Sequence, residues 1–444
     1  MNKRKAALHN LGCKVNAYET EAMQQMLEQA GYEIVPFGPG ADVYVINTCT
    51  VTNIADRKSR QMLHRAKKMN PHALVVAAGC YVQAAKEDLE VDEAIDIVIG
   101  NNKKKDLVKI LEEYEKSRDE EFVIDVNHTS EYESLSISRT AEHTRAYIKV
   151  QDGCNQFCSY CIIPYARGRV RSRRMPEVLE EVRSLAANGY QEVVLTGIHL
   201  SSYGVDLDTN LLELIKAVHQ VEGIRRIRLG SLEPRIITEE FAHTLAGLKK
   251  VCPHFHLSLQ SGCGETLKRM NRRYSPEEYY EKCCLLRQVY DDPALTTDVI
   301  VGFPGETDEE FEETRKFLEK IEFYETHIFK YSRRKGTKAA SMEHQVLDEI
   351  KTRRSNTLLA LNENMKEKFE NRRQNREDEV LFEERCVLDG EEYYTGHTRE
   401  YIRMAMPADA DYGNKIVSVN VEKARKHNIL LCTKKMIQKI DCIL

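Results

Sequence analysis

The chain has 444 residues, of which 30% are charged and 42% are hydrophobic, and its formal net charge is −5 at pH 7. This length allows roughly two to four domains, and the acidic balance excludes a surface that is basic overall, so an RNA site must be a local patch. The first residues hold too short an apolar run for an export signal, and no apolar run approaches a membrane span. We therefore expect a cytoplasmic protein whose 13 cysteines include metal ligands rather than forming a disulfide framework.

Residues 5–100 alternate between strand-like apolar runs and amphipathic helical segments. This alternation predicts a doubly wound parallel α/β domain, with helices on both faces of the sheet. The expected strands are 5–11, 42–48, 74–78 and 95–99, and the expected helices are 19–30 and 55–69.

Three cysteines each follow one of these expected strands: Cys13, Cys49 and Cys80. Parallel strands place their carboxyl ends at one edge of the sheet, where open α/β sheets bind ligands. The three thiols are therefore expected to converge on a metal cluster. The alternative, that they are small apolar fillers, stays open on the residues alone.

The next segments predict a linker and a second α/β domain. Residues 1–110 form the first domain, and residues 111–140 read as the end of a helix and an exposed linker. Residues 141–372 repeat the strand–helix alternation, which predicts a partial parallel (βα)6 barrel with its site at the carboxyl ends of the strands. The expected strands are 146–150, 192–196, 226–229, 254–259, 297–301 and 326–330.

Cys154, Cys158 and Cys161 have the spacing C-x3-C-x2-C and follow the first strand of the predicted barrel. Three thiolates suit a [4Fe–4S] cluster and leave one iron free for chemistry. The alternative is buried or zinc-binding cysteines. The spacing resembles the signature of the radical S-adenosylmethionine (SAM) enzymes, in which the free iron binds SAM and the cluster cleaves it to a 5′-deoxyadenosyl radical.

Small and polar residues at the ends of later strands lie on the same predicted face as this loop. By the resemblance we expect them to contact SAM. They are Thr196, Gly197, Ser231, Gln260 and Val301. Many radical SAM proteins have Gly-Gly-Glu after the second strand, whereas residues 195–199 here read Leu-Thr-Gly-Ile-His.

The last part of the chain predicts a long charged helix over residues 345–376 and a small β-barrel within residues 373–440. Its expected strands are 380–382, 393–396, 401–404 and 416–421.

RNA contact is expected at two places. An arginine-rich stretch offers bidentate partners for phosphate, and the β-barrel offers stacking and backbone contacts. The residues are Arg167, Arg169, Arg171, Arg173 and Arg174 in the first place, and Tyr401 and Arg403 in the second. The alternatives are arginines that pair with carboxylates inside the barrel or with SAM, and an ordinary barrel core with a solvated face.

The motifs together resemble the methylthiotransferases, over nearly the whole chain, including a C-terminal barrel of the TRAM kind. Residues 11–16 read Leu-Gly-Cys-Lys-Val-Asn. That motif is similar to the branch that modifies N6-threonylcarbamoyladenosine at tRNA position 37. The resemblance implies methylthiolation of C2 of that base, two [4Fe–4S] clusters and SAM as cofactors, and no membrane. It also implies the tRNA anticodon loop, an external one-electron reductant such as a flavodoxin, and a sulfur donor as partners.

Two rival functions remain at this point. One is the same chemistry on N6-isopentenyladenosine or on a ribosomal protein, whose branches more often show other residues after the glycine and cysteine of the opening motif. The other is a non-catalytic RNA-binding iron–sulfur sensor, which would not need glycine loops that face SAM.

Overall fold

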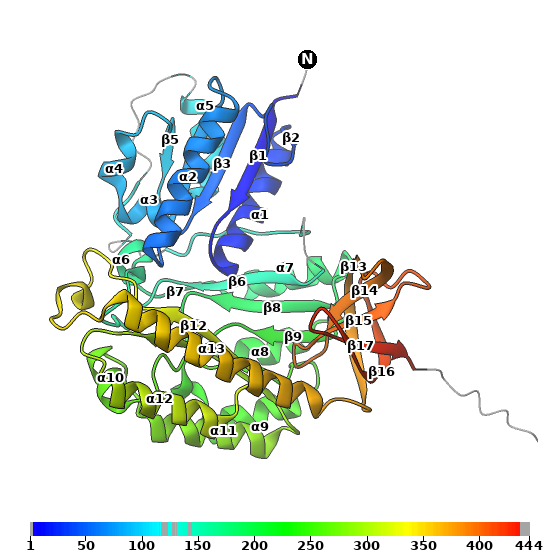
Figure 1. The fold of residues 1–444 in the computed structure, drawn as a ribbon. Coiled ribbons are helices and arrows are strands. Elements are labelled where there is room, and N and C mark those ends of the chain that lie inside the picture. The colour runs from blue at the N-terminus through cyan, green and yellow to red at the C-terminus, as the bar shows by residue number, and fades with distance from the viewer. Residues whose placement is uncertain are drawn as a thin grey trace, which may run out of the picture.

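A computed structural model describes residues 3–114, 116, 123–126, 129, 131–140 and 144–435. Figure 1 shows three units: a sheet domain in blue, a larger strand–helix domain in green and yellow, and a small barrel in orange and red. None of the helices in this part of the chain is long and apolar enough to cross a membrane.

The first unit is a five-stranded, all-parallel sheet with strand order β2-β1-β3-β4-β5. Helices α1 and α5 cover one face and α2, α3 and α4 cover the other, so the prediction of a doubly wound sheet is confirmed. The strands are β1 (Lys5–Asn10), β2 (Glu33–Ile34), β3 (Val43–Thr48), β4 (Leu74–Gly79) and β5 (Ile97–Ile99). The helices are α1 (Lys14–Gln29), α2 (Asn53–Met69), α3 (Cys80–Ala84), α4 (Lys86–Glu90) and α5 (Leu107–Tyr114).

The second unit is the expected partial barrel of six parallel strands. Sheets β7-β6-β8-β9 and β10-β11-β12 are joined by a parallel bridge between Leu232 and Leu257, whereas β6 and β12 are not paired, so the barrel is open on one side. Its strands are β6 (Ala146–Asp152), β7 (Arg171–Ser172), β8 (Glu192–Gly197), β9 (Arg226–Leu229), β10 (His254–His256), β11 (Ala294–Val301) and β12 (Glu325–Lys330). Only the short β7 runs antiparallel to its neighbour, β6.

Helices pack around the outside of the six strands. Two of them begin with reciprocal capping boxes, Ser275 with Glu278 and Thr307 with Glu310, which satisfy free backbone N–H groups at the helix start. The helices are α6 (Ile163–Arg167), α7 (Met175–Ala187), α8 (Leu211–His219), α9 (Glu239–Gly247), α10 (Gly264–Arg269), α11 (Pro276–Val289), α12 (Asp308–Ile321) and α13 (Asp348–Asn371).

The strands of the partial barrel are apolar outside and polar inside. Ile227, Phe255 and Val299 belong to the core beneath the helices. Because side chains alternate along a strand, Arg228 and Asp298 face the lumen instead. The lumen is therefore suited to a polar ligand.

The third unit is a closed five-stranded barrel in the order β13-β14-β15-β17-β16. It docks on the amino-terminal ends of β8 and β9: Arg226 donates to the carbonyl oxygen of His397, at 3.0 Å, and Arg228 to that of Arg399, at 2.8 Å. Figure 1 shows it at the end of these strands opposite α6. Its strands are β13 (Glu377–Leu388), β14 (Glu391–His397), β15 (Arg403–Pro407), β16 (Lys415–Lys426) and β17 (Ile429–Lys434).

The described part of the expected linker differs from the prediction, because much of it is buried. Leu135 and Ile137 pack into the core of the partial barrel. The backbone of this segment is also held, since Tyr18 Oη donates to Leu135 O at 2.6 Å and Ile137 N donates to Glu181 at 2.7 Å. The segment therefore ties α1 to α7. Parts of residues 111–140, and residues 436–440 of the last domain, lie outside the described residues.

Candidate functional site

The first cysteine loop begins where β6 ends. Gly153 has φ +71°, and a Cβ there would lie 1.8 Å from the carbonyl oxygen of Arg169, so only glycine fits. The loop then turns tightly, because Cys161 N donates to Cys158 O at 2.9 Å. The loop therefore lies at the carboxyl end of the strand, where an α/β barrel carries its site.

Charge and backbone donors surround these thiols. Arg272 Nη1 lies 3.3 Å from Cys158 Sγ, and Gln156 N lies 3.5 Å from Cys154 Sγ. Burial, together with the nearby Cys158, raises the pKa of Cys154 to about 11 and that of Cys161 to about 12. The thiols of Cys154 and Cys161 are therefore protonated without metal, and a metal must displace their protons to bind.

The second set of cysteines lies at the carboxyl ends of three adjacent strands. Cys13 follows β1, Cys49 follows β3 and Cys80 follows β4. Gly12 has φ +109°, and a Cβ there would lie 2.9 Å from Cys49 Sγ. Burial, together with the nearby Cys80 and Cys13, raises the pKa of Cys49 to about 12, so the three thiols are electrostatic neighbours. The expected convergence of these cysteines is thus seen in the structure.

Arg167 connects the second cysteine set to the start of the first loop. Its Nε lies 3.0 Å from Cys80 Sγ, and its Nη1 lies 3.2 Å from both carboxylate oxygens of Asp152, the last residue of β6. It also pairs with Glu19 of α1 at 2.8 Å and donates to Asn16 at 2.7 Å. The side chain is fully buried.

The buried charges around Arg167 fit an anionic cluster. Two carboxylates, Glu19 and Asp152, pair with four cations, and a third buried carboxylate, Glu133, acts on Lys149, so positive charge is still in excess beside Cys80. The cations are Lys104, Lys149, Arg167 and Arg171. Three thiolates around an iron–sulfur core would supply the missing negative charge.

The sheet domain also contacts the opposite edge of the open barrel. Arg334, in the loop after β12, donates to Thr50 Oγ1 at 2.6 Å and pairs with Asp56 at 2.6 Å. Thr50 follows Cys49 directly. The second cysteine set is therefore anchored to the β6 edge through Arg167 and to the β12 edge through Arg334.

The residues expected to contact SAM all lie at the carboxyl ends of barrel strands. Gln260 has φ +73° and joins β10 to β11, since its N–H donates to Asp298 O at 2.8 Å. A Cβ on Gly197 would lie 2.8 Å from Gln151 Oε1. Thr196 is buried and Ser231 is exposed, whereas the Val301 side chain packs into the core. Val301 can therefore offer a ligand only its backbone.

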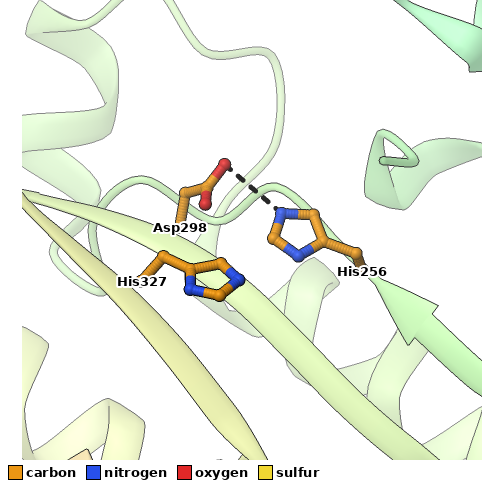
Figure 2. Close-up of side chains that lie close together, drawn as sticks. All are labelled: His256, Asp298 and His327. Carbon is orange, nitrogen blue, oxygen red and sulfur yellow. Dashed lines mark ion pairs between the residues drawn. The ribbon is translucent and has the colours of Figure 1, made fainter. Parts of the chain in front are cut away.

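Three histidines and an aspartate line the lumen on the β10–β12 side. Figure 2 shows His256, Asp298 and His327 turned toward one another, with His256 Nε2 3.3 Å from Asp298 Oδ2. Their ligand atoms all lie within 4.8 Å, a spacing that could also hold a metal ion. Burial, then Arg228 and Lys14, hold the pKa of His254 well below its usual range, so this imidazole is neutral at pH 7.

Lys14 reaches the same lumen from the sheet domain. Its side chain is solvent-accessible, yet protein surrounds its ammonium group, and the charges that act on it belong to Arg228, Arg145, Glu192 and Asp298. Enclosure by protein and the two arginines lower the pKa of Lys14 to about 8.

The structure changes the set of arginines available to RNA. Arg167, Arg171 and Arg173 are buried, and their guanidinium groups bond to carboxylates or to backbone carbonyls, as the alternative reading expected. Their burial leaves no surface for phosphate, so they are removed from the RNA prediction. Arg169 and Arg174 are exposed.

The two candidate RNA-binding residues of the C-terminal barrel, Tyr401 and Arg403, also differ in their exposure. The Tyr401 ring stacks on His397 at 4.4 Å and lies 4.8 Å from the guanidinium carbons of Arg145 and Arg228. It belongs to the contact between the two barrels rather than to a free surface. Arg403 is exposed and pairs with Glu384 at 3.2 Å.

Several residues of the site carried no usable sequence signal. Glu19, Lys104, Lys149 and Arg272 were not singled out as site residues from the sequence, and the fold brings them to the cysteine sites. For His256 and His327, only the alternation of histidine with apolar residues along the strands indicated that these side chains face the lumen.

Comparison with known proteins agrees with this geometry. The radical SAM superfamily matches residues 148–318, and the uncharacterized protein family UPF0004 matches residues 5–100. A solved radical SAM methyltransferase, TsrM from Kitasatospora setae, superimposes with a TM-score of 0.57 at 16% identity, over 76% of this chain and 77% of that one. Fold and cysteine loop thus define a radical SAM enzyme.

Relatives with higher identity define the family within that superfamily. Threonylcarbamoyladenosine tRNA methylthiotransferase MtaB of Bacillus subtilis is 41% identical over 94% of both chains. The Aquifex aeolicus protein of the same name is 41% identical over 88% of this chain and 95% of its own. A tRNA-2-methylthio-N(6)-dimethylallyladenosine synthase from Thermodesulfovibrio yellowstonii is 35% identical over 97% of this chain and 98% of its own.

The chain belongs to the radical SAM methylthiotransferase family, and it is a transferase. Its cofactors are SAM and two [4Fe–4S] clusters, which the two cysteine sets fit in donor type, number and surrounding charge.

Proposed function

We propose that this protein methylthiolates C2 of N6-threonylcarbamoyladenosine at position 37 of tRNA, giving the 2-methylthio derivative. The observation that carries the proposal is the pair of three-cysteine sites joined by Arg167, which contacts Cys80 at one site and Asp152 at the start of the other. The substrate rests on the motif at residues 11–16 and on the names of the relatives at 41% identity.

The reaction replaces an unactivated C–H bond, which no side-chain base can deprotonate. When bound, SAM and the clusters supply the radical and the sulfur that this replacement requires. The chain's own residues position these groups: Cys154, Cys158 and Cys161 provide thiolates for one cluster, and Cys13, Cys49 and Cys80 for the other. Arg272 and Arg167 lie beside one sulfur of each set and add positive charge there.

Exposed cations beside the first cysteine loop support tRNA binding. Arg169, Arg174 and Lys105 line a groove of about 730 Å³ between the sheet domain and the partial barrel. Arg169 also lies over the Phe157 ring, 4.5 Å from its centroid, so its guanidinium plane is held in place within the cysteine loop. Guanidinium groups there can pair with phosphates as a base enters the lumen.

The partners follow from this chemistry. The anticodon loop is the part of tRNA whose base can leave its stack to reach the lumen. The enzyme needs an external one-electron donor, such as a flavodoxin, and a sulfur donor, and we place it in the cytoplasm with its tRNA. We also keep residues 1–110, 141–372 and 373–440 as the proposed domains, the last a TRAM-like RNA-binding barrel.

Nucleoside mass spectrometry of tRNA from cells that lack the gene tests the function. We expect 2-methylthio-N6-threonylcarbamoyladenosine to disappear and N6-threonylcarbamoyladenosine to accumulate. The wild-type gene should return both nucleosides to their normal levels, and a Cys154→Ala copy should not. Loss of the methylthio group from isopentenyladenosine alone would assign the protein to the other substrate.

A further inference from the structure

The lumen beneath the second cysteine set contains a cation without an ion-pair partner. Lys14 is the first residue of α1 and directly follows Cys13. In the described part of the chain its ammonium group makes no hydrogen bond or ion pair, although four charged lumen residues act on it. Its side chain is also solvent-accessible, so an anionic group of a ligand can reach it.

The neighbouring cations differ from Lys14 because each already has a carboxylate. Arg145 pairs with Glu383 at 3.0 Å, and Arg228 pairs with Glu192 at 2.7 Å. Asp298 acts on Lys14 from β11, but it faces His256 at 3.3 Å. Of these cations, only Lys14 is free to take an anion from a ligand.

The β10–β12 wall of the lumen is also built for hydrogen bonding. His254 is 7% exposed, and its Nδ1 has no hydrogen-bond partner among the described residues. His256 and His327 stack with ring centroids 5.7 Å apart and edges turned toward Asp298. An apolar group placed here would leave His254 Nδ1 unpaired, which disfavours such a group.

The proposed substrate matches this pattern. Its N6 substituent carries a carbamoyl group, a hydroxyl group and a carboxylate, and it is attached to the same six-membered ring as C2. If C2 lies near the cluster held by Cys13, the short substituent ends within reach of the next residue, Lys14. An isopentenyl group would bring neither charge nor hydrogen bonds.

We propose that Lys14, with His254, His256 and His327 across the lumen, forms the binding site for the carboxylate-bearing N6 substituent, and that Lys14 pairs with the carboxylate. This inference rests on the proposed function and makes Lys14 a specificity-determining residue.

Binding of two synthetic anticodon stem-loops tests the proposal. They differ only at position 37, where one carries N6-threonylcarbamoyladenosine and the other its methyl ester, which lacks the charge. The proteins are anaerobically reconstituted wild type, Lys14→Met, Lys14→Arg and Lys109→Met, a matched control on the exposed face of α5. Affinities are measured without reductant.

We expect wild type and Lys109→Met to bind the acid at least about tenfold more tightly than the ester, as a charge-assisted bond predicts. Lys14→Met should bring this ratio close to one, and Lys14→Arg should keep most of it. Equal binding of acid and ester by wild type, or an undiminished ratio in Lys14→Met, would overturn the proposal. The proposed function is tested by a separate measurement. It would be refuted if the wild-type protein formed no methylthio product on tRNA that carries N6-threonylcarbamoyladenosine.

Discussion

The buried carboxylate of Glu19 offers a test of how the sheet domain is held on the barrel. It pairs with Lys104 at 3.0 Å, Lys149 at 2.8 Å and Arg167 at 2.8 Å, and all four side chains are inaccessible to solvent. Glu19→Gln keeps the shape and removes the one carboxylate that pairs with all three cations among the described residues. Breaking a buried ion pair by removing one partner costs about 3–5 kcal/mol, and with three cations affected we expect the upper end.

Arg167→Met should lower the free energy of unfolding by less, about 3 kcal/mol. In this variant Glu19 still pairs with both lysines, and Asp152 still pairs with Lys149 at 2.6 Å. The double variant removes one charge of each sign. Its loss of stability should therefore be smaller than the sum of the two single losses by more than about 1 kcal/mol, as for residues in direct contact.

The effect of Glu19 also has a defined pH dependence. Burial would raise the pKa of Glu19, but Arg167, Lys104 and Lys149 outweigh it and hold the pKa well below the ordinary value of 4.5. A lowered folded-state pKa stabilises the protein above the unfolded-state pKa, and that contribution is lost as the pH falls through the folded value. The loss of unfolding free energy caused by Glu19→Gln should thus be constant from pH 6 to pH 8 and shrink below about pH 4.5.

Thermal unfolding followed by circular dichroism measures these differences. At about 2–4 °C per kcal/mol for a domain of this size, Glu19→Gln should lower the midpoint by roughly 8–20 °C. Single losses that add within about 0.5 kcal/mol in the double variant would refute a shared buried network, as would a Glu19→Gln deficit that grows toward acid pH.

Three further outcomes are expected. The Cys154/Cys158/Cys161→Ala variant should keep about half of the roughly eight irons of two four-iron clusters and lose reductive SAM cleavage; a variant that still makes 5′-deoxyadenosine would contradict the assignment. Burial and then Glu400 raise the pKa of Asp378 to about 7, so Asp378→Asn should stabilise the C-terminal barrel by about 1 kcal/mol at pH 8. That gain should fade as the pH falls from about 7 toward 3.8, and urea unfolding at several pH values checks it. Arg169→Met should weaken tRNA binding and flatten its log–log salt dependence by about 0.7 per lost phosphate contact, whereas an unchanged slope in filter binding would remove Arg169 from the interface.

Both cysteine sets could be predicted because local patterns determine them. Cys13, Cys49 and Cys80 each follow an apolar run, and a parallel sheet brings such positions to one edge. The spacing of Cys154, Cys158 and Cys161 lies within a single loop. The partial barrel followed from its repeated alternation of strands and helices.

What the sequence did not reveal depends on contacts between distant segments. In the sequence, the arginines at 167, 171 and 173 cannot be told from the exposed arginines of the same stretch. They are buried because they pair with carboxylates at positions 19, 152 and 181. The alternation of Leu135 and Ile137 in the linker is too short to stand out from a polar stretch. The position of the C-terminal barrel depends on backbone carbonyls that accept from Arg226 and Arg228, and carbonyls leave no trace in a sequence.

The central claim is tested most directly by the product formed on a defined tRNA. Reconstituted protein, SAM and reductant are incubated with one tRNA that carries either N6-threonylcarbamoyladenosine or N6-isopentenyladenosine at position 37, and the nucleosides are analysed by mass spectrometry. We predict a methylthio product on the threonylcarbamoyl form and little or none on the isopentenyl form. A methylthio product on the isopentenyl form alone would contradict the proposed function.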